Sequence, residues 1–405
     1  MVGVKRKRCT NSMDVISNMP DEILHEIQSN LTFKHIRRTT SVSKRFNRLA
    51  MSTPVVDMSE WWHESDCEGS YCDCVPWLGF DEVMDEVILE NETTIKKCVL
   101  DIFENFYDQK MITKWITKLV ERRKVQELKL FFGFHINNED DADYDFMERT
   151  VKTKLYIPQC LFESPTLTSL ELICTNDSPR SLRLPKRFSL GKLKSFIVIG
   201  FKFANNNLIS QLFSNCPVLE EVSLKDCTFE KTNAGHIFGS ISSTVKVVKL
   251  HDSIFKDLFC VDGFEISGLP MFYNLVSLDI TFDYDNIGKI FDFLHLVPNL
   301  EKLVFRESTW ACKTFDGGNG AWELSVVPRC FSLNLKSVTL KYNVRLDPEM
   351  IYVAKLFLRN AIVLQKMTLS NSKLRRVHLE DNNSKLMEEL QTVPRGSASC
   401  QIEFI

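Results

Sequence analysis

The stretch that decides the fold is a hexapeptide that returns at equal spacing: LTSLEL at residues 167–172, LKSFIV at 193–198, LEEVSL at 219–224 and VKVVKL at 245–250. Apolar residues occupy its first, fourth and sixth positions, and successive copies start 26 residues apart. Such spacing is typical of a repeat in which one short strand and one return segment make a coil. The last two apolar positions lie two residues apart, so both side chains face the core from one side of a strand.

Further copies extend the pattern in both directions. They begin at Ile95, Val125, Leu275, Leu300, Leu335 and Leu364, which gives ten copies at intervals of 25 to 42 residues. Three residues after the last apolar position, seven copies carry a small polar residue or cysteine, as expected where a coil turns inward: Thr175, Cys227, Ser253, Asp283, Ser308, Asn343 and Ser372. Stacked coils of this kind present a broad concave surface without a deep cleft, which favours the binding of another macromolecule.

The composition is that of an intracellular globular chain. With 405 residues, 44% hydrophobic residues and a net charge of -3, the chain has room for two or three domains and is neither strongly basic nor strongly acidic. No window approaches the ~18 apolar residues of a membrane span, and the polar N-terminus lacks the apolar stretch of a signal peptide. We therefore expect the thirteen scattered cysteines to be reduced thiols.

The N-terminus bears on localisation. Lys5, Arg6, Lys7 and Arg8 form a basic run that is either a nuclear import signal or a solvated tail. We expect the chain to be cytoplasmic, nuclear or both.

A segment of helical periodicity, residues 14–49, precedes the repeats. Pro20 suits the first turn of a helix, and the acidic residues after it complement the helix dipole. Ile23, Leu24, Ile27 and Leu31 form an apolar stripe, and a second helical stretch runs from about residue 33 to residue 49. Two short helices bury too little surface to be stable alone. They either cap the repeats or dock on a partner.

The order of residues in this segment resembles an F-box. Members of that family read roughly L-P-D-E-[IL]-L, then an apolar stripe, then V-L-S-K-R-W; here MPDEIL stands at 19–24 and VSKRF at 42–46. The resemblance implies binding to the adaptor subunit of a cullin-based (SCF) ubiquitin ligase and, through it, to the cullin. It assigns the adaptor contacts to Pro20, Ile23, Leu24, Ile27, Leu31, Val42 and Phe46. Apolar residues are usual where Arg37 and Ser41 stand, and Trp is usual at Phe46, which predicts a weaker adaptor interface than in a typical member.

The C-terminal region extends the resemblance. FLRNA at 357–361, VLQKM at 363–367 and the closing PRGSASCQIEF at 394–404 are similar to the FBD domain, which ends a plant family of F-box, leucine-rich-repeat proteins. The residues themselves predict an amphipathic helix over 348–364 and a terminal strand over 400–404. Together these elements would close the open end of the repeats, where a sheet edge is otherwise exposed.

The predicted fold class is α/β. A leucine-rich-repeat solenoid with a curved parallel sheet follows a small all-helical F-box and is closed by an α+β FBD-like region. We expect a basic tail at 1–13, the F-box at 14–60, a linker at 61–90, repeats at 91–330 and the FBD-like region, with the last repeats and the C-terminal cap, at 331–405.

The chain offers no convincing catalytic, metal or cofactor site. His63, Cys67, Cys72 and Cys74 are all zinc-ligand types, but their spacing matches no common zinc motif, so a linker is the favoured interpretation. Acidic residues at 139–145 lack the glycine of a calcium loop, and the glycine-rich stretch at 317–320 lacks the Lys-Ser/Thr of a phosphate loop. We predict no bound metal, no cofactor and no enzymatic activity.

A cationic column is the best candidate for target binding. The residue after the third apolar position of each copy should point to the concave side. Copies five to ten carry Lys225, His251, Thr281, Arg306, Lys341 and Ser370 there, and Lys249 and Lys302 stand on the same face. Such a column suits an acidic or phosphorylated partner. Alternatively, these cations only discourage aggregation of an exposed strand face.

The favoured function is a non-catalytic substrate-recognition subunit of an SCF-type ubiquitin ligase, with no nucleic-acid or membrane partner. The alternative is a repeat scaffold whose N-terminal helices only cap the solenoid. A third possibility is a co-receptor for a small molecule, which would need a pocket of converging cations on the concave face. Exposure of Ile23, Ile27 and Leu31 in the isolated chain would favour the first of these over the second.

Overall fold

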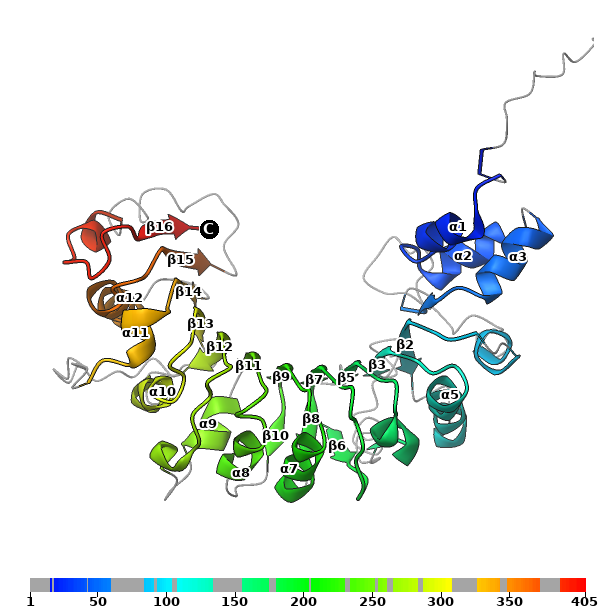
Figure 1. Cartoon of the computed structure of the whole chain (residues 1–405), viewed down its shortest axis with the longest axis horizontal. Coiled ribbons are helices and arrows are strands. Elements are labelled where there is room, and N and C mark those ends of the chain that lie inside the picture. The colour runs from blue at the N-terminus through cyan, green and yellow to red at the C-terminus, as the bar shows by residue number, and fades with distance from the viewer. Residues whose placement is uncertain are drawn as a thin grey trace, which may run out of the picture.

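A curved parallel sheet is the main element of the chain. The computed structural model describes residues 15–16, 18–41, 43–59, 84–90, 93–103, 108–133, 155–174, 180–203, 205–229, 234–251, 254–260, 265–282, 287–307, 326–342, 348–371 and 387–405. Twelve strands of this described part lie side by side in an arc (Figure 1). In spatial order they are β1 (Val55–Asp57), β2 (Lys97–Phe103), β3 (Glu127–Gly133), β5 (Ser169–Cys174), β7 (Ser195–Ile199), β9 (Glu221–Lys225), β11 (Val247–Leu250), β12 (Ser277–Phe282), β13 (Lys302–Glu307), β14 (Ser337–Tyr342), β15 (Lys366–Asn371) and β16 (Gln401–Phe404).

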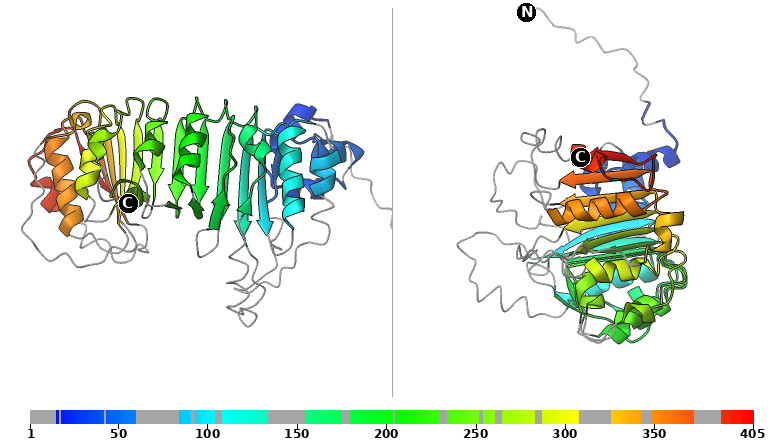
Figure 2. Two further views of the ribbon diagram at one scale, coloured as in Figure 1. Left: turned by 90° about the horizontal axis from the view of Figure 1, so that it is seen from below. Right: turned by 90° about the vertical axis from the view of Figure 1, so that its left-hand side faces the viewer.

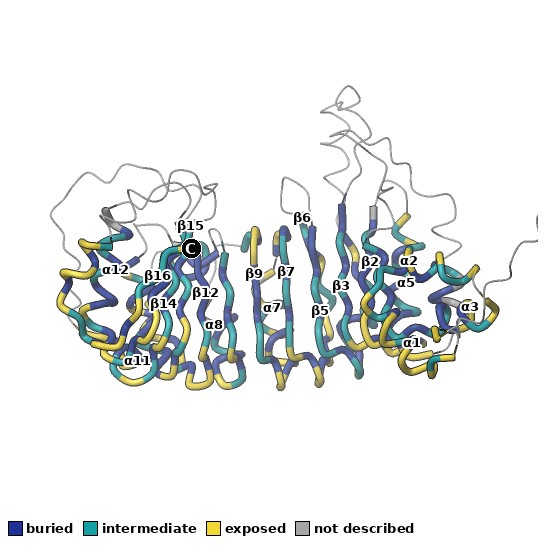
Figure 3. The backbone as a smooth tube through the Cα atoms, turned by 90° about the horizontal axis from the view of Figure 1, so that it is seen from above, coloured by how far each residue is buried: buried dark blue, intermediate teal, exposed yellow. Residues whose placement is uncertain are grey.

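The register of the sheet follows the hexapeptide. Each of the ten copies contributes one strand, from β2 to β15, and the middle apolar positions pair directly, as Leu170 does with Phe196 and Leu278 with Leu303. These side chains are buried, as is Val222. Buried and partly exposed residues alternate along the strands (Figure 3). The predicted α/β architecture with a parallel sheet is confirmed.

Helices cover the convex side of the sheet, where they bury its apolar face (Figure 2). They are α5 (Gln109–Glu121), η3 (Gln159–Glu163), α7 (Asn206–Ser214), α8 (Ala234–Gly239), α9 (Ile254–Phe259), η4 (Ile266–Gly268), α10 (Ile287–Leu294), α11 (Arg329–Leu333) and α12 (Pro348–Asn360). Phenylalanine rings join neighbouring coils in this layer: the centroids of Phe259 and Phe293 are 5.3 Å apart, and those of Phe331 and Phe357 are 5.0 Å apart. Aromatic contacts of this kind add to the stabilisation from buried area.

A second, smaller parallel sheet lies on the convex side and was not expected from the repeats. Its strands, in spatial order, are β10 (Thr228–Phe229), β8 (Phe201–Phe203), β6 (Arg180–Arg183) and β4 (Leu155–Tyr156). Gly200 connects β7 to β8 with a φ of +77°, and a Cβ at this position would collide with the carbonyl group of Cys174. Only glycine adopts this conformation freely, so Gly200 lets the chain turn from the main sheet into the second one.

The N-terminal segment forms three helices, α1 (Asp21–Gln28), α2 (Phe33–Thr39) and α3 (Lys44–Met51). The single helix predicted over residues 33–49 is therefore wrong. The Thr40 hydroxyl donates to the carbonyl of Arg37, and the Ser43 hydroxyl accepts from the backbone N–H of Phe46. Hydroxyl side chains that bond to nearby backbone groups favour helix ends, which explains the break.

Of the linker predicted at 61–90, the structure describes residues 84–90. The sheet already begins at β1, ahead of the predicted start at residue 91, because β1 pairs with β2. A π-helix, η1 (Asp85–Glu90), contributes Val87 and Ile88 to the core. Arg123 is fully buried and donates to the carbonyl oxygens of Val87 and Thr93. These contacts attach η1 to the first repeat.

The C-terminal end closes the opposite end of the arc. α12 ends at Asn360, before the predicted end at 364, because Leu364 is the first core position of the last repeat copy. β16 pairs in parallel with β15, and Lys366 forms an ion pair with Glu403 at 2.7 Å. The Ser397 hydroxyl donates to the carbonyl of Leu364 at 2.6 Å. The terminal strand predicted over 400–404 is confirmed.

Candidate functional site: two interaction surfaces

The first candidate surface is a pair of isoleucines on α1, which we call the α1 stripe. Ile23 and Ile27 lie one helical turn apart, and 44% and 47% of their surfaces are exposed. Val15 and Ile16, which precede the helix, are also exposed. Neighbouring apolar side chains left in water on one helix face are typical of a surface that a partner covers.

A small internal core supports the stripe from behind. Leu24, Phe46 and Leu49 form a buried cluster between α1 and α3. Arg45 reinforces it, because its Nε donates to Oδ1 of Asp21 at 2.9 Å and its guanidinium also donates to the carbonyl of Met19. These contacts hold α1 against α3 and leave Ile23 and Ile27 exposed.

The predicted adaptor residues divide by position. Pro20, Ile23 and Ile27 are exposed, whereas Leu24 and Phe46 are buried and serve the internal core. Leu31 is half-buried against the main core of the solenoid. Val42 lies outside the described residues. A helical stripe read from the sequence does not tell which of its residues face inward, so the exposed set is smaller than the predicted one.

The second candidate surface is the concave face of the sheet. The predicted column follows its strands: Thr281 pairs with Arg306, and Arg306 pairs with Lys341. Lys225 ends β9, and the backbone N–H of His251 donates to the carbonyl of Leu224 on that strand at 3.0 Å. The column is thus one continuous row across neighbouring coils.

Two carboxylates that the sequence analysis missed lie beside this row. Nε and Nη2 of Arg306 donate to the two carboxylate oxygens of Asp279, each at 2.6 Å, and Nε2 of His251 lies 3.3 Å from Oδ1 of Asp279. Glu221 accepts from Nζ of Lys249 at 2.7 Å. Burial would raise the pKa of Asp279, but the hydrogen bonds from His251 and Arg306 outweigh it and lower that pKa to about 2. The carboxylate is therefore ionised and holds the Arg306 side chain in place, with His251 beside it.

The other cations of the column are less engaged. Lys225 lies 3.8 Å from its neighbour Asp226, and half of each side chain is in water, so this pair is weak. Lys302 is exposed and Lys341 half-buried. No ion pair of either lysine occurs within the described ranges. On the strands from β9 to β14, the concave positions carry five lysine and arginine side chains against two carboxylates, Glu221 and Asp279.

The same row is apolar on β3, β5 and β7, which the sequence analysis did not single out. Phe131, Ile173 and Ile199 pair in succession on β3, β5 and β7, and Ile199 pairs with Lys225. Ile197 stands beside them on β7. The signal was present in the sequence, because Phe131, Ile173 and Ile199 occupy the same slot of the repeat as the cations.

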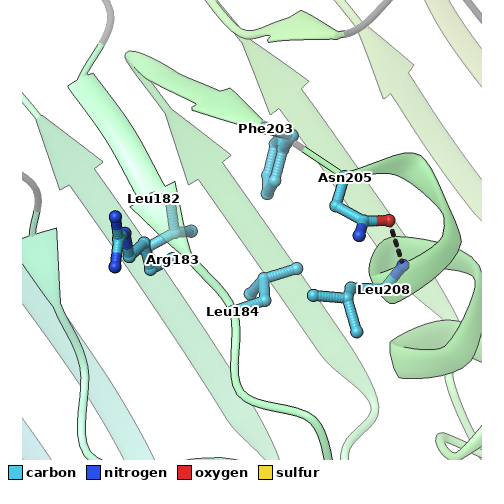
Figure 4. A pocket seen from close by; sticks show the side chains of 6 residues that line it. All are labelled: Leu182, Arg183, Leu184, Phe203, Asn205 and Leu208. Carbon is cyan, nitrogen blue, oxygen red and sulfur yellow. Dashed lines mark hydrogen bonds between the residues drawn. The ribbon is translucent and has the colours of Figure 1, made fainter.

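A small hollow on the convex side completes the described surface features. It has a volume of about 180 Å³ and lies where β6 and β8 meet α7 (Figure 4). It is lined by Leu182, Arg183, Leu184, Phe203, Asn205 and Leu208. The Asn205 side chain accepts from the backbone N–H of Leu208 at 3.3 Å and so caps α7. This mainly apolar hollow does not provide the converging cations on the concave face that a small-molecule co-receptor would need.

The described residues contain no group of three or more His, Cys, Asp or Glu side chains arranged to hold a metal. Within the same ranges, no helix has the length and apolarity needed to cross a lipid bilayer. The eight described cysteines are free thiols, and burial raises the pKa of Cys227 to about 12, which keeps it protonated. The basic run at 5–8, the candidate zinc ligands His63, Cys67, Cys72 and Cys74, the acidic stretch at 139–145 and the glycine-rich stretch at 317–320 lie outside the described residues.

Comparisons with known proteins match three domains in the same order. A family model of the F-box domain matches residues 16–56. A second model, which describes the leucine-rich repeats of an FBD-associated F-box protein, matches residues 112–280, and a third, of the FBD, matches residues 323–369. A putative F-box/FBD/LRR-repeat protein of Arabidopsis thaliana is 24% identical, with 98% of each chain covered. Another F-box/FBD/LRR-repeat protein of that plant is 24% identical over 100% of this chain and 99% of its own. In domain content, domain order and full-length similarity, the chain resembles the F-box/FBD/leucine-rich-repeat proteins.

Proposed function

We propose that the chain is the substrate-recognition subunit of an SCF-type ubiquitin ligase. The F-box match supports a partner at residues 16–56, and the exposed α1 stripe is the observation that carries the proposal. The stripe would bind the adaptor subunit, and the solenoid would hold a target protein. The chain itself would perform no chemistry.

The connection between the two surfaces supports this function. β1 follows α3 after three residues and pairs with β2 over Val55 to Asp57, so the helices are attached to the sheet by backbone hydrogen bonds. A receptor acts by holding a target lysine near the conjugating enzyme, which raises the effective concentration of the reacting groups. A stiff connection serves that function better than a flexible tether, because it restricts the orientations that the target samples.

The scaffold alternative, in which the helices only cap the solenoid, also has an observation in its favour. Phe33 and Ile36 of α2 and Ala50 of α3 belong to the main core of the solenoid. The helical segment therefore does close the N-terminal end of the sheet. Capping alone, however, does not require the apolar side chains that α1 exposes on its other face, and adaptor binding does.

Substitution of the α1 stripe tests the proposal. The variant with Ile23→Asp and Ile27→Asp should lose capture by the immobilised SCF adaptor subunit, because two charges replace apolar contacts at the centre of the interface. The control is Ile362→Asp, which places the same charge on an isoleucine that is 53% exposed in the FBD region. Equal capture of the wild type and the double variant would refute adaptor binding through α1.

A further inference from the structure

We propose that the concave face binds a target segment in which a cluster of apolar residues lies next to an acidic stretch. The apolar cluster would lie over β3, β5 and β7, and the acidic stretch over β9 to β14. The inference rests on the proposed function in one respect only, namely that the bound segment belongs to a ubiquitination target.

The apolar half of the surface consists of the half-buried side chains of Phe131, Ile197 and Ile199, together with Ile173, which is 9% exposed. The sheet pairs three of them in succession on adjacent strands, and strands lie about 4.8 Å apart, so these side chains form one continuous patch. Nζ of Lys129 lies 4.9 Å from the centre of the Phe131 ring and forms an ion pair with Glu171 at 3.0 Å. The patch therefore has a polar border on one side, as recognition sites for apolar side chains commonly do.

The cationic half begins where the patch ends, because Ile199 pairs with Lys225. Asp279 and Glu221 neutralise Arg306 and Lys249, which leaves Lys225, Lys302 and Lys341 as the excess positive charge. Screening confines the field of each of these charges to about 8–10 Å at cellular salt, so a counter-charge must lie in contact with the face. An acidic segment in contact with the face would supply the counter-charge.

Strand-forming preference alone does not explain the apolar half. β-branched residues favour strands, which would account for isoleucine at any of these positions. The equivalent concave positions of the later strands, however, carry the β-branched but polar residues Thr281, Thr339 and Thr368, with Val304 on β13 as an apolar exception. Threonine meets the same strand preference without exposing an apolar surface, so the segregation of isoleucine and phenylalanine into β3, β5 and β7 calls for another cause. A target segment with an apolar part beside an acidic part would account for both the apolar patch and the adjoining positive charge.

A peptide selection tests the proposed chemistry. The two halves together span eight strands, or roughly 34 Å, which an extended peptide of about 10 residues covers. A random library of peptides of about 16 residues would be selected on the full-length chain. We expect enriched sequences to contain an apolar cluster beside a run of Asp or Glu. Enrichment of acidic sequences without the apolar cluster, or of apolar sequences without the acids, would overturn the proposal.

Two variants locate the binding of a selected peptide. Ile197→Thr with Ile199→Thr removes apolar surface and keeps the β-branched shape, and Lys225→Gln with Lys341→Gln removes charge without disturbing Asp279. Each pair should weaken binding about tenfold or more, as removal of central contacts does. The control, Lys110→Gln with Lys289→Gln on α5 and α10, should bind the peptide as the wild type does. Unchanged affinity in either test variant, with thermal melting as in the wild type, would overturn the proposal.

The same variants separate this inference from the proposed function. Both concave variants should keep wild-type affinity for the SCF adaptor, and the α1 variant should keep wild-type affinity for the peptide. Should a concave variant melt early, the single substitutions Ile199→Thr and Lys341→Gln give the same comparison with smaller effects. Loss of peptide binding in the α1 variant would mean that the selected peptide binds the helices, which also overturns the proposal.

Discussion

Arg306 on β13 donates two hydrogen bonds of 2.6 Å to the carboxylate of Asp279 on β12, and Nε2 of His251, the residue after β11, lies 3.3 Å from the same carboxylate. A bidentate pair of this kind is stronger than a single ion pair and fixes both side chains. The carboxylate therefore organises the middle of the concave face. Asp279 therefore holds Arg306 in place, and Lys225 and Lys341 are the cations of the row that the proposed target segment would contact.

Loss of Asp279 should destabilise the fold in a pH-dependent way. Its pKa of about 2 lies below the value near 3.9 of an unfolded chain, so the carboxylate contributes stability above about pH 4 that is lost as pH falls through 2. Allowing for solvent screening of partly exposed partners, we expect Asp279→Asn to lower the free energy of unfolding by on the order of 1–2 kcal/mol at neutral pH. Urea unfolding measures the difference, which should shrink below pH 4; a difference independent of pH would contradict the assignment.

Asp101, at the apolar end of the concave row, should give the folded chain the opposite dependence of stability on pH. Burial raises its pKa to about 7, helped by the nearby Asp57 carboxylate and opposed by Lys129. The folded chain thus retains a proton that the unfolded chain loses, and stability falls as pH rises from about 4 to about 7. Asp101→Asn, which cannot ionise, should be more stable than the wild type at about pH 8 and nearly equal at about pH 4. A stability difference that stays constant over this range would show that Asp101 ionises normally.

Leu278 tests the register of the sheet. It is fully buried as the middle apolar position of its copy, whereas Val276, two residues earlier, is 38% exposed. Leu278→Ala should cost about 2–5 kcal/mol because it leaves a cavity in the core. Val276→Ala should cost less than about 0.5–1 kcal/mol, as surface truncations do. Chemical denaturation of both variants measures the contrast, and similar costs at the two positions would place Leu278 outside the core.

Gln28, at the end of α1, should weaken the helical segment. It is 3% exposed, and neither its side-chain oxygen nor its nitrogen has a hydrogen-bond partner in the described part of the chain. Buried polar atoms without partners cost about 1–3 kcal/mol, so Gln28→Met, which keeps the length of the side chain, should stabilise the fold by about that amount. Glu26→Met on the exposed side of the helix is the control. A lower melting temperature for Gln28→Met than for the wild type would contradict this account.

The sequence predicted the strands better than the elements around them. The apolar triplets locate ten strands, because every second residue of a strand that faces the core must be apolar. β1 and the second sheet were missed because segments of two to four residues, such as Thr228–Phe229, carry too few side chains to show a period. The break between α2 and α3 depends on hydroxyl groups that return to the backbone, as Thr40 does, and apolar periodicity does not report them.

The candidate surfaces were predicted in outline. The slot that carries Lys225, Arg306 and Lys341 was identified from the repeat, but its carboxylate partners were not, because Asp279 and Glu221 occupy other slots and meet the cations only across strands. On α1 the stripe was identified, but the burial of Leu24 depends on α3, which lies twenty residues further along the chain. The residue pattern within one segment does not report its contacts with distant segments.

The central claim is that one chain joins the adaptor of an SCF ligase to its target. Analytical ultracentrifugation of the purified chain mixed with the SCF adaptor subunit and the cullin tests it most directly. The account predicts one species that contains one copy of each, and a chain carrying Ile23→Asp and Ile27→Asp should sediment separately. A folded wild-type chain that sediments alone at 46.9 kDa beside the adaptor–cullin complex would contradict the account.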